Sequence, residues 1–185
     1  MTTLNATPYV VAIGGTQRPG SSSEKALEAV LDDVRAAGAE TRLFNGASLA
    51  KLPLFDPSIT DRTPEESEFV EEVRRADAVV IATPGYHAGI SGLVKNALDL
   101  LEDLRTDERP YLDGRPVGCI VTAGGWQGAG VTLSSLRDIV HALRGWPTPV
   151  GLTINSALPE WREDGIAAYA TTVSALAKQL LHFRS

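Results

Sequence analysis

Apolar runs and amphipathic stretches alternate along the chain, and this alternation predicts an α/β fold. Runs rich in apolar or β-branched residues predict five strands, at residues 9–14, 41–44, 78–82, 117–122 and 149–154. Apolar positions at helical spacing predict the helices between and after them, at about residues 22–37, 63–76, 93–104, 131–143 and 166–181. Because strands and helices alternate with short connections, we expect an open, doubly wound parallel sheet with helices on both faces.

The third predicted strand, residues 78–82, is wholly apolar, as expected for a strand buried on both faces of a parallel sheet. In a doubly wound sheet of order 2-1-3-4-5, a crevice opens between the first and third strands at their carboxyl ends. Residues 45–63 show no evident periodicity and predict a loop, ordered against the site or a partner. Thr63 and Pro64 then read as an N-cap and a first-turn proline.

The composition fits a single domain that spans residues 1–185, with 43% hydrophobic and 22% charged residues. The net charge is −6 and no basic block stands out, so a nucleic-acid or membrane partner is not expected. No apolar run approaches the length of a membrane span, and residues 1–5 lack a signal-peptide pattern. The single cysteine, Cys119, lies in an apolar strand and is expected to be a buried core residue. A cytoplasmic location is the expectation.

Residues 15–23 follow the first predicted strand and lead into the first predicted helix, where backbone N–H groups and the positive helix end favour an anion. The loop carries hydroxyl groups and one guanidinium, on Thr16, Arg18, Ser21, Ser22 and Ser23. It contains neither a G-x-G-x-x-G nor a G-x-x-x-x-G-K-[ST] pattern, which argues against a dinucleotide site and an ATPase or GTPase. The loop therefore predicts a terminal phosphate monoester of a mononucleotide; the alternative is an ordinary turn capped by serine.

Two further loops should reach the same crevice, because they follow the third and fourth predicted strands. Residues 83–92 form the first, and residues 122–130 form the second, a glycine-rich loop with an exposed Trp126 at its tip. A flat, partly polar ring lying on residues 84–87 would suit these walls. Ordinary turn chemistry is the alternative for each loop.

Together these segments resemble the NAD(P)H-dependent FMN reductase family, a branch of the flavodoxin-like fold. The family's G-S-x-R-x-x-S loop is matched by residues 15–21, with Thr16 in place of the first serine. Its T-P-x-Y-x-x-x-x-x-G-x-[LV]-K-N-x-[LI]-D segment is matched by residues 83–99, and its glycine-rich loop by residues 124–128. The resemblance covers about residues 9–155. The chain departs from it at Gly85 and His87, where the family often has glutamate and asparagine.

By position, the resemblance implies an FMN site with no catalytic acid or base and no metal. Thr16, Arg18, Ser21, Ser22 and Ser23 would hold the phosphate. The isoalloxazine ring would lie between two groups of residues: Pro84, Gly85, Tyr86 and His87, and opposite them Gly124, Gly125 and Trp126. His87 could place a proton near the flavin, but a polar loop residue is the simpler reading. Lys95 and Asp99 are four residues apart on one predicted helix and should form an ion pair.

The implied activity is hydride transfer from NADH or NADPH to FMN, with reduced flavin supplied to a separate monooxygenase as one destination. The first alternative is an NAD(P)H:quinone or azo reductase with tightly bound FMN. The second is a flavodoxin-type electron carrier, and a non-catalytic FMN sensor also stays open. Arg18 and the modest negative charge favour the enzyme over the carrier, whose phosphate loop usually lacks arginine.

The predicted helix at residues 93–104 carries more apolar positions than one buried stripe needs: Leu93, Val94, Ala97, Leu98, Leu100, Leu101 and Leu104. We therefore expect a homodimer, or a dimer of dimers, with Leu101 or Leu104 in the contact. The alternative is that residues 45–63 of the same chain cover this helix.

Overall fold

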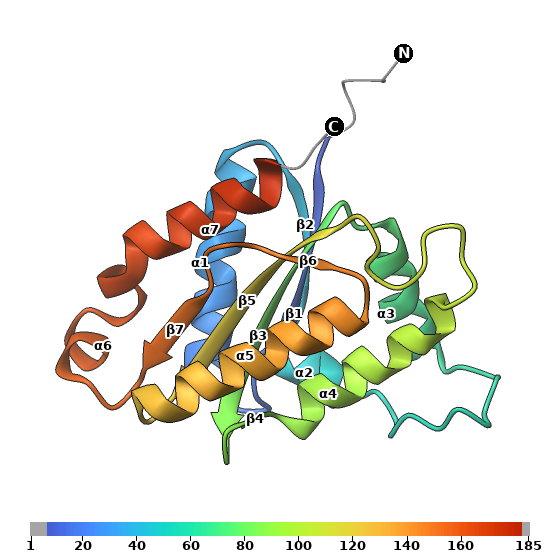
Figure 1. Cartoon of the computed structure of the whole chain (residues 1–185), viewed down its shortest axis with the longest axis horizontal. Helices are drawn as coiled ribbons and strands as arrows, with labels where there is room; N and C mark the ends of the chain where they lie inside the picture. Colours follow the sequence, from blue (N-terminus) through green and yellow to red (C-terminus); the bar gives the residue numbers. More distant parts are fainter. Residues whose placement is uncertain (1–6, 183–185) are drawn as a thin grey trace.

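A computed structural model describes residues 7–182 and has a parallel sheet at its centre (Figure 1). Its main strands are β1 (Tyr9–Gly14), β2 (Glu40–Phe44), β3 (Ala78–Tyr86), β5 (Pro116–Ala123) and β7 (Leu152–Asn155). They pair in parallel in the order β2-β1-β3-β5-β7, which confirms the predicted order 2-1-3-4-5. Two short strands are additions: β4 (Gly89–Ile90) pairs antiparallel with β3, and β6 (Trp146–Pro147) pairs with the start of β5.

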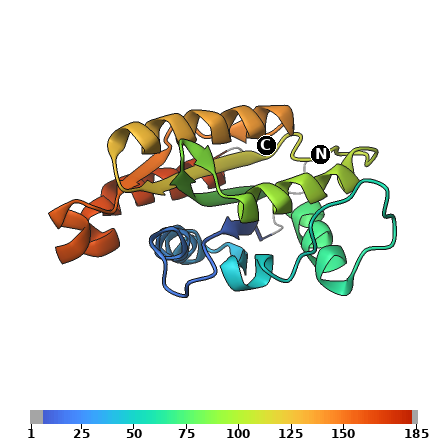
Figure 2. The same cartoon turned by 90° about the horizontal axis from the view of Figure 1, so that it is seen from below.

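Helices cover both faces of the sheet, as predicted. One face is covered by α1 (Ser22–Ala36) and α7 (Ala170–His182). The other is covered by α2 (Gly46–Leu49), α3 (Pro64–Arg75), α4 (Gly92–Asp99) with its 3-10 continuation η1 (Leu100–Leu104), and α5 (Trp126–Ala142). Figure 2 shows α5 and α1 on opposite sides of the central strands. Within residues 7–182, no helix is both long enough and apolar enough to cross a membrane.

Several predicted boundaries were wrong. The helix predicted from residue 131 begins at Trp126, because Ala129 and Thr132 continue the buried face of Leu136 and Val140 despite the glycines between them. Trp126 therefore lies in the first turn of a helix and not at a loop tip. The predicted loop at residues 45–63 contains the one-turn helix α2, and the last predicted helix starts as the 3-10 turn η2 (Gly165–Tyr169), after the short α6 (Pro159–Glu163).

Both ends of α3 have polar partners. Thr63 and Glu66 form a capping box at its start, and Pro64 occupies the first turn, as predicted. At its other end the buried Arg115 donates to the carbonyl oxygens of Arg74 and Ala76, at 2.6 and 2.9 Å. These bonds satisfy carbonyl groups that a helix terminus leaves open. Burial lowers the pKa of Arg115 to about 10.

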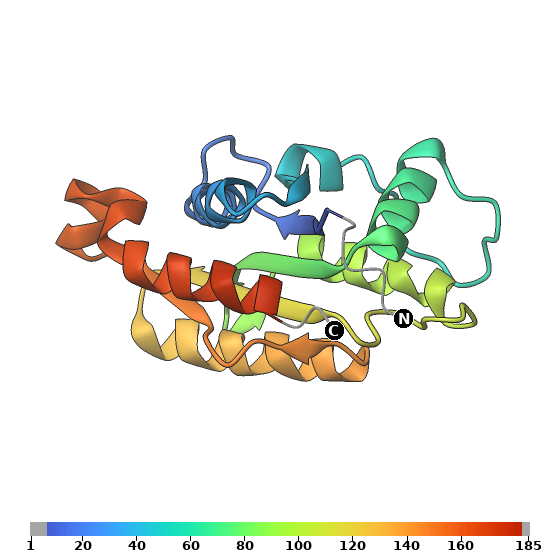
Figure 3. The same ribbon diagram turned by 90° about the horizontal axis from the view of Figure 1, so that it is seen from above.

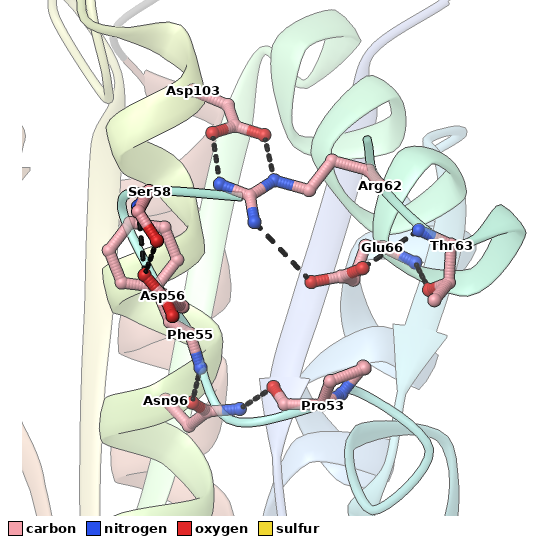
Figure 4. Close-up of polar contacts among 9 residues, drawn as sticks. All are labelled: Pro53, Phe55, Asp56, Ser58, Arg62, Thr63, Glu66, Asn96 and Asp103. Carbon is pink, nitrogen blue, oxygen red and sulfur yellow. Dashed lines mark hydrogen bonds and ion pairs between the residues drawn. The ribbon is translucent and has the colours of Figure 1, made fainter. Parts of the chain in front are cut away.

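The segment between α2 and α3 lies at the end of the molecule beside α3 and α4 (Figures 1 and 3). Figure 4 shows its anchors. The Asn96 amide donates to the carbonyl oxygen of Pro53 and accepts from the backbone N–H of Phe55, both at 2.8 Å. Arg62 makes a two-pronged ion pair with Asp103, at 2.8 and 2.9 Å. The segment is therefore tied to α4 and η1 of its own chain.

These contacts bear on the expected dimer contact. Leu101 and Leu104 are both fully buried within one chain, in a cluster that also includes Phe69 and Leu112. Phe55 of the anchored segment packs against the same cluster. The prediction that Leu101 or Leu104 lies in a dimer contact was therefore wrong, because the chain's own elements cover the helix on the sides that the sheet does not.

Cys119 lies in β5 and is 1% exposed, which confirms that it is a core residue. Burial raises the pKa of its thiol to about 12.

The ion pair that was predicted between Lys95 and Asp99 on α4 is present.

Truncating Leu101 should destabilise the fold, since it leaves a cavity in the cluster. We expect Leu101→Ala to lower the free energy of unfolding by about 2–5 kcal/mol. Leu54→Ala is the matched control, because Leu54 is 86% exposed, and it should change that free energy by no more than about 0.5 kcal/mol. Urea denaturation of both variants tests this, and a Leu101 variant as stable as the wild type would contradict the packing.

Candidate functional site

A cavity of about 240 Å³ opens at the carboxyl ends of the central strands. Its lining residues are Thr16, Arg18, Ser21, Ser22, Ser23, Pro84, Gly85, Tyr86, Thr122, Ala123, Gly124 and Ser156. The structure thus brings together nine of the twelve residues predicted for the site. The remaining three, His87, Gly125 and Trp126, do not line it. Three lining residues were not among the predicted site residues: Ser156, and Thr122 and Ala123, which begin the loop predicted to reach the crevice.

The first wall is the loop between β1 and α1. Ser21 is the N-cap of α1, and its hydroxyl accepts a hydrogen bond from the Glu24 N–H at 3.3 Å. The buried Ser23 hydroxyl lies 3.4 Å from it. Arg18 is exposed, and its guanidinium has no ion pair or hydrogen bond within residues 7–182. The positive end of α1, a cluster of hydroxyls and an unpaired cation therefore face one cavity.

Residues outside the cavity fix the shape of this loop. The Glu24 carboxylate accepts from the Gly20 N–H at 2.9 Å and from the Asn45 side-chain amide at 3.0 Å. Gly46 packs directly on Thr16, since a Cβ at position 46 would lie 1.8 Å from the Thr16 carbonyl oxygen. Sequence reasoning missed Glu24, Asn45 and Gly46. The available signal was the position of Asn45 and Gly46 at the carboxyl end of the strand next to β1.

The second wall is a hairpin rather than the plain loop that was expected. Gly85 and Tyr86 pair with Ile90 and Gly89 across a two-residue turn, in which both central residues, His87 and Ala88, have positive φ. Such a turn favours Asn-Gly, so His-Ala is a costly choice at this place. His87 is exposed at the tip, away from the lining, and its predicted contact with a flavin ring stays a prediction.

The third wall is formed by Ala123 and Gly124, where β5 leads into α5. Gly125 is the N-cap of α5, and no side chain caps this helix end. Trp126, in its first turn, is 52% exposed. The first amide groups of α5 therefore have no side-chain partner within the described residues, and the helix begins two residues after Gly124 of the cavity lining.

A second cavity of about 240 Å³ adjoins the first. Both are lined by Thr16, Pro84 and Tyr86. The second cavity reaches past these residues to Gln17 and the start of α4, at Gly92 and Leu93. Each cavity is smaller than the roughly 300–1,000 Å³ usual for a ligand site, whereas the two together fall within that range. Within the described part of the chain, no group of three His, Cys, Asp or Glu side chains could hold a metal ion.

Comparison with known proteins identifies the family. The family model described as NADPH-dependent FMN reductase matches residues 8–158, and the chain belongs to this family. An FMN-dependent NADPH-azoreductase of Staphylococcus haemolyticus is 35% identical over 109 residues, which are 59% of this chain and 54% of the relative. The chain thus spans about half the length of the curated relatives it matches.

Solved structures share the fold. The flavoenzyme NAD(P)H:(acceptor) oxidoreductase FerB from Paracoccus denitrificans superimposes with a TM-score of 0.74 at 21% identity, over 96% of this chain and 99% of the other. An oxidoreductase from Corynebacterium diphtheriae superimposes with a TM-score of 0.73 at 22% identity, over 97% and 99%. Together with the strand order, these neighbours confirm the predicted flavodoxin-like fold.

The contact between Gly46 and Thr16 makes a prediction for ligand binding. A methyl group at position 46 forces the Thr16 backbone to move, and overpacking of this kind costs about 1–3 kcal/mol. We therefore expect Gly46→Ala to weaken FMN binding roughly tenfold or more. Gly130→Ala is the control, because its added Cβ would meet no atom within 4 Å apart from its chain neighbours and its own helix backbone. Fluorescence titration measures both, and equal FMN affinities in the two variants would remove Gly46 from the support of the site.

Proposed function

We propose that this chain binds FMN in the cavity between β1, β3 and β5 and reduces it with NADPH or NADH. The observation that carries the proposal is the gathering of nine predicted residues around one cavity, in a chain of the NADPH-dependent FMN reductase family. When bound, FMN supplies the redox chemistry, since its ring accepts a hydride from a nicotinamide nucleotide.

The phosphate end of the cavity supports FMN by its donor set. Thr16, Ser21, Ser22 and Ser23 offer hydroxyl donors, and Arg18 offers a guanidinium that no carboxylate occupies within the described residues. All lie at the positive end of α1, where a dianionic phosphate gains from the helix dipole and from charge-assisted hydrogen bonds. The proposed role of these residues is to bind and orient the cofactor.

The ring end of the cavity supports the same reading. The backbone of residues 84–86 forms one wall and Gly124 forms the other, so two flat backbone surfaces approach a ring from both sides. The uncapped N-terminus of α5 lies beside Gly124 and would stabilise negative charge on the ring edge. Tyr86 is 57% exposed between the two cavities, a position from which it can guide a second planar substrate onto the ring.

A second candidate function differs in the final electron acceptor. In this reading FMN stays bound and passes electrons to an azo compound or quinone. The name of the Staphylococcus haemolyticus relative, FMN-dependent NADPH-azoreductase, favours it, as does the second cavity beside Tyr86. A flavodoxin-type carrier would not need this second cavity.

The location and the protein partners remain predictions of the sequence. We propose a cytoplasmic protein, and a monooxygenase that uses the reduced flavin remains a candidate partner. We also propose a homodimer or a dimer of dimers. Because Leu101 and Leu104 are buried within one chain, the proposal now rests on apolar side chains that are exposed elsewhere on the surface. Leu54, Ile59, Tyr86, Trp126 and Val131 are large apolar side chains that are at least half exposed.

Light scattering at micromolar concentration tests the oligomer. We expect a mass near twice, or near four times, the 19.7 kDa of one chain. A mass of one chain, measured with and without FMN, would exclude the dimer.

Anaerobic mixing tests the activity. We expect NADPH or NADH to bleach the absorbance of protein-bound FMN within seconds, because the cavity orients the ring and leaves one approach open. Dithionite, a chemical reductant, is the control that shows whether the protein-bound FMN can be reduced at all. If dithionite bleaches the flavin and neither nucleotide does, the proposed reductase activity is wrong, and the chain is instead an electron carrier or an FMN sensor.

A further inference from the structure

Strand β2 forms one edge of the central sheet. It pairs with β1 on its inner side, and within residues 7–182 no strand pairs with its outer side. An edge strand presents N–H and C=O groups that can pair with a strand of another chain. The backbone directions and the charges of β2 indicate which strand fits this edge.

The backbone groups at this edge have a fixed direction. The Glu40 N–H donates to the Pro8 carbonyl oxygen at 2.7 Å, so the N–H and C=O groups of Glu40 face β1. Along a strand, the N–H and C=O groups of successive residues point to opposite sides. Those of Thr41 and Leu43 therefore point away from β1, where a strand on the outer side could bind them.

Two opposite charges lie on one face of β2. The side chains of Glu40 and Arg42 are two residues apart and share the face that packs against α3. Arg42 makes an ion pair with Glu68 of α3, and its guanidinium carbon lies 5.2 Å from the centre of the Phe44 ring. The Arg42 side chain is still 47% exposed, and a guanidinium has donors for a second carboxylate. The exposed Glu40 carboxylate has no ion pair or hydrogen bond within residues 7–182.

This charge pattern is complementary to itself. If two copies of β2 pair antiparallel with Thr41 opposite Thr41, the outward N–H and C=O groups of both face each other. Each Glu40 then lies directly opposite Arg42 of the other copy, so the contact contains two opposite-charge pairs. The neighbouring registers centre the two-fold axis on Arg42 or on Glu40, and each places like charges opposite one another. Only the register centred on Thr41 avoids this repulsion.

We propose that the outer edge of β2 binds β2 of a second copy of this chain, antiparallel about a two-fold axis at Thr41, and so joins two sheets into one. A two-fold contact of this kind requires a surface that complements itself, which the order of Glu40 and Arg42 provides. The contact is separate from the exposed apolar side chains discussed above and does not depend on FMN. By itself it forms a dimer, and with a second contact it forms a dimer of dimers.

Charge reversal tests the register. Glu40→Arg places positive side chains opposite each other at both pairs, and Arg42→Glu places negative ones there. We expect each variant alone to show half the wild-type mass by light scattering at micromolar concentration, because like charges directly opposite destabilise strand pairing. An equimolar mixture of the two restores both opposite-charge pairs and should regain the wild-type mass. Glu28→Arg is the matched control: it makes the same charge change at an exposed position of α1 and should keep the wild-type mass.

A backbone variant tests the strand pairing itself. Thr41→Pro removes an N–H that points away from β1, so it should leave the pairing of β1 with β2 intact and halve the mass of the assembly. Thr41→Val is its control, since both changes remove the hydroxyl that accepts from the Arg35 side chain at 2.9 Å, but valine keeps the N–H. The Thr41→Val variant should therefore keep the wild-type mass.

Three results would each overturn the proposal: a wild type with the mass of one chain, a Glu40→Arg variant with the wild-type mass, or a mixture of the charge variants that stays at half that mass. If Arg42→Glu fails to fold, because it also opposes Glu68 within its own chain, Glu40→Arg and Thr41→Pro still decide the outcome. Circular dichroism of each variant shows whether it is folded.

Discussion

The close approach of β1 to β3 is the constraint on which the site depends. The two strands pair in parallel from Val10 and Ala78 to Gly14 and Ala82. Gly14 has a φ of +143°, and a Cβ there would lie 1.9 Å from the Ala82 carbonyl oxygen, so only glycine allows this contact. The chain turns away at this point, and the Gly15 N–H still donates to the Ala82 oxygen at 3.3 Å. This turn directs the loop at residues 15–21 toward the end of β3, where the hairpin wall begins.

Polar groups at the site and away from it differ in whether they have hydrogen-bond partners. Away from it several charged or buried groups are paired: Arg115 with the last carbonyls of α3, Thr63 with Glu66, and Arg62 with Asp103. The buried hydroxyl of Thr132 and the Nε atom of Arg137 are exceptions. Around the cavity, the Arg18 guanidinium has no partner within the described residues, and no side chain caps α5. Hydrogen-bonding capacity left open in one place is what a binding site for a polar cofactor requires.

The fold was predictable because it depends on local patterns. Apolar runs identified the strands, whereas the strand order was inferred from the fold type, because the sequence does not encode it directly. The start of α5 was missed because Gly128 and Gly130 lower helix propensity, while the burial of Ala129, which favours the helix, is a tertiary effect. The burial of Leu101 was misjudged for the same reason. A helical wheel counts apolar positions, but it does not reveal that Phe55 and Leu112 pack in the same cluster. Glu24 and Ser156 support the site through contacts with Asn45 and Ala123, which lie far from them in the sequence, so no local signal identified their roles.

The central claim is that the loop from Thr16 to Ser23 holds the phosphate of FMN. Comparing the affinities of the unmodified protein for FMN and riboflavin tests it most directly, because these flavins differ only in the phosphate. Charge-assisted hydrogen bonds contribute about 1.5–3 kcal/mol each, so FMN should bind roughly a hundredfold more tightly or better. Equal affinities for the two flavins would contradict the account.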